Sequence, residues 1–325
     1  YNAGSQTTTG TQNVFVGTYT GDANTTASNN TAFGYNAMGA NTTGDSNVAI
    51  GSQAFITNTV GDRNIAVGVG ALETFNPAYN VAVGKEALST DTKGSKSVAI
   101  GMGTLANQNF TSATDTFNTA VGHIAGNSIT TGIANTYIGG LSGDASTTAS
   151  ANTALGYNSM SSVTTGDNNV AVGSDALFTN TVGDRNVAVG KGALENHNPA
   201  SNADTYNVGV GWGAGSALTT GQNNTAVGGT ALYKATTGDS NTALGIFSMG
   251  NGVVTGDFNV AVGYAAAYSL TSGSNNLALG KDAGRTGSPG GQVTVGNNSI
   301  YLGDDNIGDA YIQVDWTISS DERDK

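Results

Sequence analysis

One five-residue phrase, Asn-x-Ala-x-Gly, recurs along most of the chain and organises its polar and apolar positions. Sixteen copies lie between Asn13 and Gly280, and 11 of the 15 intervals between them are 17 residues long. The second position is always Val, Ile, Leu or Thr, the third is Ala in 13 copies, the fourth is always Val, Ile, Leu or Phe, and the fifth is always Gly. This alternation of bulky and small residues predicts a short β-strand at each copy.

The rest of each unit predicts a second short strand and two turns. Three residues after the Gly comes another small residue, often followed by Leu, Met or Phe, and the unit closes with Thr-Thr-Gly-Asp or a variant, as at residues 42–45. Gly and Asp favour tight turns. Because 17 residues are too few for the common helical repeats and no helical periodicity is present, we expect an all-β fold, a parallel β-roll solenoid of about 16 coils.

The Asn of the phrase keeps its place in 15 of the 16 copies, which predicts a ladder of stacked amide side chains. A turn-forming role alone would explain the Asn but not its fixed distance from the Ala and Gly. The Gly-Asp turns are expected to be capped turns rather than a calcium roll, whose characteristic nine-residue phrase is absent. The ladder residues singled out are Asn47, Asn64, Asn80, Asn169, Asn186, Asn224, Asn241 and Asn259.

Two units of 21 residues carry four extra residues each, near residues 107–115 and 195–204. Because a coil cannot absorb an insertion, we expect both segments to leave the shaft as loops. Phe110 and His197, set among Asn and Ser, are candidates for stacking on a receptor and hydrogen bonding to it. A purely structural role for both loops is the alternative.

Composition narrows the classes of partner and cofactor. The chain has 325 residues, no Cys, a formal net charge of −12 and only 11 Lys and Arg residues, which argues against binding to nucleic acid. The two His residues are 74 positions apart and Cys is absent, so we expect no metal and no cofactor. No apolar run approaches the roughly 20 residues that cross a bilayer, so no membrane insertion is expected.

Several copies of the phrase resemble a known family. Asn-Val-Ala-Val-Gly at residues 80–84, 186–190 and 259–263 is similar to the head repeats of trimeric autotransporter adhesins of the YadA type. The resemblance covers about residues 13–283. It implies a left-handed parallel β-roll in which three chains pack side by side, and therefore a homotrimer.

The C-terminal segment points to a second family. We expect a β-roll shaft over residues 1–284, a small C-terminal β cap over 285–318, and the start of a further domain over 319–325. The ending, from Ser320 and Asp321 to Lys325, resembles the opening of the intramolecular chaperone domain of phage tail fibres and tailspikes, the peptidase S74 family. The resemblance implies cleavage between Ser320 and Asp321, with Ser320 as nucleophile and Lys325 as its base. A solvated charged tail is the alternative interpretation.

These patterns together predict a structural and adhesive homotrimeric segment of a phage tail fibre or similar virion appendage. Its partners would be further copies of itself, a host-surface glycan or protein receptor, and other virion proteins. It would act outside the cell, and not as an enzyme apart from self-cleavage. A bacterial trimeric autotransporter-type adhesin is one alternative; a tailspike that degrades glycans with two carboxylates is another.

Overall fold

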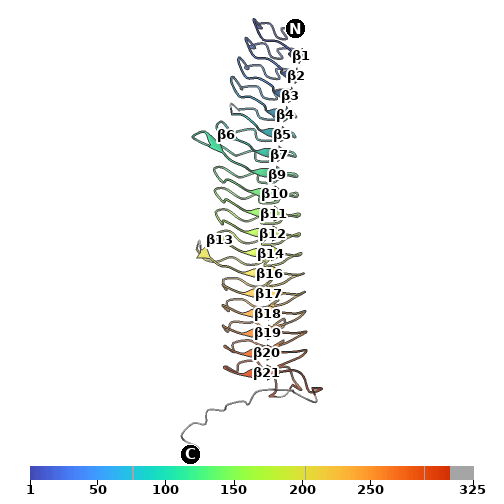
Figure 1. Cartoon of the computed structure of the whole chain (residues 1–325), viewed down its shortest axis with the longest axis vertical. Coiled ribbons are helices and arrows are strands. Elements are labelled where there is room, and N and C mark those ends of the chain that lie inside the picture. Colours follow the sequence, from blue (N-terminus) through green and yellow to red (C-terminus); the bar gives the residue numbers. More distant parts are fainter. Residues whose placement is uncertain (75–76, 202, 289, 308–325) are drawn as a thin grey trace, which may run out of the picture.

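The chain forms one elongated stack of β-coils, with the N-terminus at one end (Figure 1). The computed structural model describes residues 1–74, 77–201, 203–288 and 290–307, and these ranges contain no helix. The strands are β1 Val14–Val16, β2 Thr31–Phe33, β3 Val48–Ile50, β4 Ile65–Val67, β5 Val81–Val83, β6 Gly94–Ser95, β7 Val98–Ile100, β8 Thr114–Asp115, β9 Thr119–Val121, β10 Thr136–Ile138, β11 Thr153–Leu155, β12 Val170–Val172, β13 Gly183–Asp184, β14 Val187–Val189, β15 Ala203–Asp204, β16 Val208–Val210, β17 Thr225–Val227, β18 Thr242–Leu244, β19 Val260–Val262, β20 Leu277–Leu279 and β21 Ile300–Leu302.

Seventeen of these strands form one parallel sheet along the stack. Each strand pairs with that of the next coil, position for position: Ala49 of β3 lies beside Ala66 of β4, which lies beside Ala82 of β5. The short strands β6 and β8, and β13 and β15, form two separate pairs that project to the side at the two insertions (Figure 1). The predicted all-β parallel solenoid with a repeat of about 17 residues is therefore confirmed.

The predicted second strand of each unit is wrong for the described coils, because the chain turns there instead. In the coil of β3, Gln53 and Phe55 have φ values of 59° and 55°. The same pair of positive φ values recurs in later coils, for example at Asp175 and Leu177. A strand requires negative φ at both positions, whereas two left-handed residues separated by one residue turn the chain back across the coil.

The interior of the stack is narrow and is divided between small and large side chains. In the long sheet the central residue of every strand from β2 onward is buried while its neighbours point outward, as for Ala171 in β12. Fully buried turn residues such as Phe55 and Leu177 belong to the same continuous core cluster as the strand alanines. A small residue from the strand therefore leaves space for a large one from the turn, which keeps the interior filled.

Two coils reverse this division of space. Phe15 and Tyr137 replace Ala at the centre of β1 and β10, and Gly21 and Gly143 occupy the turn position that holds Leu, Met or Phe in most coils. A Cβ atom on Gly143 would lie 2.6 Å from Tyr137 Cζ, and one on Gly21 would lie 2.6 Å from Phe15 Cε1. In these two coils the ring on the strand leaves no room for a side chain at the turn residue.

The shaft continues beyond the expected boundary at residue 284, so that boundary is wrong. Strand β21 pairs in parallel with β20, with Tyr301 beside Ala278, and Ser299 N–H donates to Asn276 Oδ1 at 3.2 Å. The segment from Ser299 to Gly303 is thus another copy of the phrase, in which Ser and Tyr stand in place of Asn and Ala. Residues 292–295 form no strand, and residues 308–325 lie outside the described part of the chain.

Candidate functional site

The Asn residues of the phrase form a buried, hydrogen-bonded ladder. Asn47 N–H donates to Asn30 Oδ1 at 2.8 Å, and Asn47 Nδ2 donates to the Gly61 carbonyl of its own coil at 2.9 Å. Each amide therefore closes its own coil and holds the next one, which satisfies buried backbone groups and leaves no amide free for a ligand. The bond to the preceding Asn is repeated by Asn64, Asn80, Asn169, Asn186, Asn224, Asn241 and Asn259.

At Ser97, where one coil has Ser in place of the ladder Asn, Gln108 from the same coil completes the hydrogen bonding. At Ser97 the short side chain cannot make both bonds, and Gln108 Nε2 donates to Ser97 Oγ at 3.0 Å. Gln108 Oε1 accepts from Asn118 Nδ2 at 2.9 Å, and Gln108 Nε2 also lies 2.6 Å from the buried Asp91 carboxylate. This substitution was missed because Gln108 lies far along the chain from the phrase that it completes.

The prediction that Phe110 and His197 present their side chains to a receptor is wrong for the single chain, because both are buried. His197 occupies the inner corner eleven residues after Asn186, where the preceding coil places Asn180 eleven residues after Asn169. The insertions therefore leave the coil after this inward-facing position, eleven residues from the start of the phrase, and not before it. After that corner, the exposed residues of the described insertions are Asn109, 111–113 and Asp115 in the first and Asn198, Ala200, Ser201 and Asp204 in the second.

His197 is a buried, weakly bonded imidazole. Its Nε2 lies 3.4 Å from Asn207 Nδ2, and its Nδ1 has no hydrogen bond of ordinary geometry. Burial lowers the pKa of His197 to about 4, with a smaller opposing effect of the Thr219 backbone. The ring is therefore neutral at neutral pH.

Protonation of His197 is expected to make the shaft sensitive to acid. Because its pKa falls from 6.5 unfolded to about 4 folded, the unfolded chain binds more protons between these values, and stability falls as pH falls through that window. Across the whole window the free energy of unfolding should fall by about 3 kcal/mol. His197→Asn places at this position the residue that the preceding coil has as Asn180. It should remove this part of the decrease in the free energy of unfolding between pH 7 and pH 4. The exposed His123→Asn serves as control; an unchanged acid response in His197→Asn would contradict the assignment.

The carboxylates of the Gly-Asp turns accept hydrogen bonds from backbone N–H groups of the preceding coil. Ser28 N–H donates to Asp45 Oδ1 at 2.7 Å, and Asp45 N–H donates to Asp62 Oδ1 at 2.7 Å. The same bond joins Asp167 to Asp184 in the second half of the chain. Among the described residues, no three His, Asp or Glu side chains gather where they could hold a metal ion.

The outward face of the long sheet is uncharged and largely apolar. Phe33 is 57% exposed, and Leu155 and Leu244 are each 46% exposed. The outward positions of the 17 strands are Val, Ile, Leu, Thr or Phe, and none carries a charge. Contiguous apolar surface on this scale marks an interaction site. Its exposed large residues are Val14, Val16, Phe33, Ile50, Ile65, Ile100, Leu155, Leu244, Leu279, Ile300 and Leu302.

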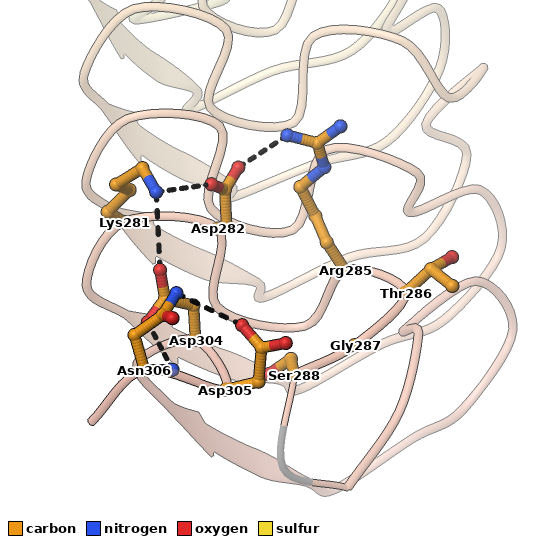
Figure 2. Close-up of a pocket in the computed structure, with 9 residues that line it drawn as sticks. All are labelled: Lys281, Asp282, Arg285, Thr286, Gly287, Ser288, Asp304, Asp305 and Asn306. Atoms are coloured by element: carbon orange, nitrogen blue, oxygen red, sulfur yellow. Dashed lines mark hydrogen bonds and ion pairs between the residues drawn. The ribbon is translucent and has the colours of Figure 1, made fainter. Parts of the chain in front are cut away.

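A polar hollow of about 270 Å³ lies near the C-terminal end of the described shaft (Figure 2). Lys281 Nζ lies 3.1 Å from Asp282 Oδ2 and 3.3 Å from Asp304 Oδ2, and Arg285 also pairs with Asp282. These bonds raise the pKa of Lys281; burial raises the pKa of Asp282, but Arg285 and Lys281 together bring it below its usual value. The charges in the hollow thus satisfy one another, and we assign no ligand to it.

The residues of the expected self-cleavage site, Ser320, Asp321 and Lys325, lie outside the described part of the chain, so their role stays a prediction. Over the residues that the structure does describe, no helix has the length and apolar character to span a bilayer. No known family model matches the chain, and no curated protein matches it significantly.

Proposed function

We propose that the protein is a structural and adhesive segment of a homotrimeric fibre, a phage tail fibre or similar virion appendage, that attaches to a host surface outside the cell. One observation carries the proposal: the outward face of the 17-stranded sheet is uncharged and largely apolar along its described length. Exposure of such a face to water is unfavourable, and a partner surface of the same length would bury it. Another copy of this chain offers that surface.

The repeat also suits association of identical chains. Coils recur at about 4.8 Å along the stack, so parallel copies can meet coil against coil over a shaft of roughly 70 to 80 Å. The number three comes from the resemblance to the YadA-type heads. Attachment would involve a host glycan or protein receptor, and the ends of the shaft would join other virion proteins.

We extend the proposal to the end of the chain on resemblance alone. Residues 319–325 would begin an attached chaperone domain that assembles the trimer and then cuts between Ser320 and Asp321, with Lys325 as base. The protein would otherwise have no enzymatic role.

The association is expected to depend on the outward strand positions. Wild-type protein should sediment at the mass of three chains. Leu155→Lys combined with Leu244→Lys should convert it to single chains at micromolar concentration, because two charges would have to be buried at each interface without partners. Analytical ultracentrifugation gives the mass.

Val60→Lys is the matched control, since Val60 is exposed but lies outside the strands. That variant should stay trimeric. A wild-type protein that sediments as a single chain or a dimer would refute the trimer, and a trimer that survives both Lys substitutions in the sheet would show that another surface holds it.

A further inference from the structure

A second hollow, of about 140 Å³, lies on the side of the shaft where the turns after β12, β14, β16 and β17 follow one another. Its walls are Asp175, Lys191, Glu195, Trp212, Ser216 and Tyr233, contributed by four successive coils. The size is below that of ordinary drug-sized pockets and suits a single ring.

Two aromatic rings form one wall of this hollow. Trp212 is 59% exposed and Tyr233 is 37% exposed, and their rings are nearly parallel, at 16° with centroids 6.3 Å apart. Exposed stacked rings present apolar faces with polar edges, which binding sites use at low cost in conformational entropy.

Glycine keeps the floor of the hollow open. Gly192 and Gly213 stand at the turn position where other coils carry side chains such as Gln53 or Asn158. A Cβ atom on Gly213 would lie 3.2 Å from the Tyr233 ring, and one on Gly192 would lie 3.1 Å from Glu195 Oε2. A side chain at either position would crowd the walls.

The polar groups around the rings can both accept and donate hydrogen bonds. The Asp175 carboxylate is held by Asn158 Nδ2 at 3.1 Å and Ser174 Oγ at 2.8 Å. Within the described ranges, the Glu195 carboxylate and the Lys191 ammonium have no hydrogen bond or ion pair. One oriented and one free carboxylate, with an ammonium beside them, supply both acceptors and donors.

We infer that this hollow binds one monosaccharide unit of a neutral or amino-sugar glycan. A sugar ring has an apolar face of C–H groups, which matches Trp212 and Tyr233, and a rim of hydroxyls that donate and accept, which matches the carboxylates and Lys191. Two carboxylates against one ammonium, on a chain of net charge −12, disfavour sialylated, sulfated or phosphorylated ligands. The inference rests on the attachment role proposed above and names its receptor class.

The row of residues that includes Trp212 does not belong to the apolar sheet face. At the same place in their coils other turns carry Lys85, Lys191, Lys281 and His123. Charged residues are depleted from the dry core of interfaces, so this row is expected to stay in water when sheet faces associate.

The test uses the full chain in its natural association state and an array of immobilised oligosaccharides with neutral, amino-sugar, sialylated and sulfated members. The dissociation constant of the best ligand is then measured by calorimetry for Trp212→Ala and Glu195→Gln. Tyr264→Ala is the matched control, because Tyr264 is an exposed aromatic at the same coil position. Thermal midpoints establish that each variant is folded.

Wild-type protein should bind to neutral or amino-sugar members of the array. The dissociation constant should rise about ten-fold or more in Trp212→Ala and Glu195→Gln and stay nearly unchanged in Tyr264→Ala. Absence of any such ligand, retention of acidic glycans alone, or unchanged binding by Trp212→Ala would overturn the inference. Glu195→Gln, which changes no shape, decides the matter if Trp212→Ala unfolds. A trimer that binds no sugar refutes this inference alone, whereas a monomer that binds sugar refutes only the trimer.

Discussion

Gly156→Ala is expected to destabilise the shaft by at least about 3 kcal/mol. Gly156 has a φ of 144°, a region that residues with a Cβ rarely adopt. Its new Cβ would lie 2.6 Å from the carbonyl carbon and oxygen of Gly173 in the next coil. Backbone cannot move aside there, because Gly156 N–H donates to Ile138 O and Gly173 N–H donates to Leu155 O, both at 2.8 Å.

The thermal midpoint at a fixed scan rate measures this loss. Gly229→Ala is the matched control: its φ is not positive, and a Cβ there would have no atom within 4 Å. We expect its stability to change by less than about 0.5 kcal/mol. Equal midpoints for the two variants would show that the close approach of coils at Gly156 does not limit the fold.

Tyr137 and Gly143 are expected to behave as a coupled pair in a double-mutant cycle. Tyr137 is fully buried, and its hydroxyl donates to Ser146 Oγ at 3.0 Å, so Tyr137→Ala should cost about 3 to 5 kcal/mol. Gly143→Leu should cost a similar amount, because its Cβ would meet the Tyr137 ring at 2.6 Å.

The double variant copies the arrangement of Ala171 and Leu177, which are both fully buried two coils further along the stack. It should recover about 2 kcal/mol relative to the sum of the single losses, since Leu fills the space that the ring leaves. The left-handed φ of 58° at Gly143 is close to the 50° of Leu177, so the backbone tolerates the change. Additive losses in chemical denaturation would contradict the exchange of volume between strand and turn.

The candidate sites were predictable where a residue type kept a constant distance from the phrase. The register of the Asn residues is visible in the sequence because each lies two positions before a buried strand residue. His197 and Phe110 were placed on exposed loops because the insertions were located only approximately. The constant eleven-residue distance that relates His197 to Asn186 and Asn180 to Asn169 is a signal that could have placed the His197 ring inside. The hollow at Trp212 has no such signal, since its walls come from four coils.

The sequence by itself determined the strand at each copy of the phrase, the coil period and the parallel register, because these follow from a local pattern repeated at a constant interval. Only the tertiary structure decided which strand face is the interior, since neither face carries charge and hydrophobicity alone does not separate Ala171 from Val170. The left-handed turns decide it: they direct Leu177 and its equivalents inward, and the remaining width of the coil accepts Ala but not Val. The larger side chains therefore point outward and form the apolar face.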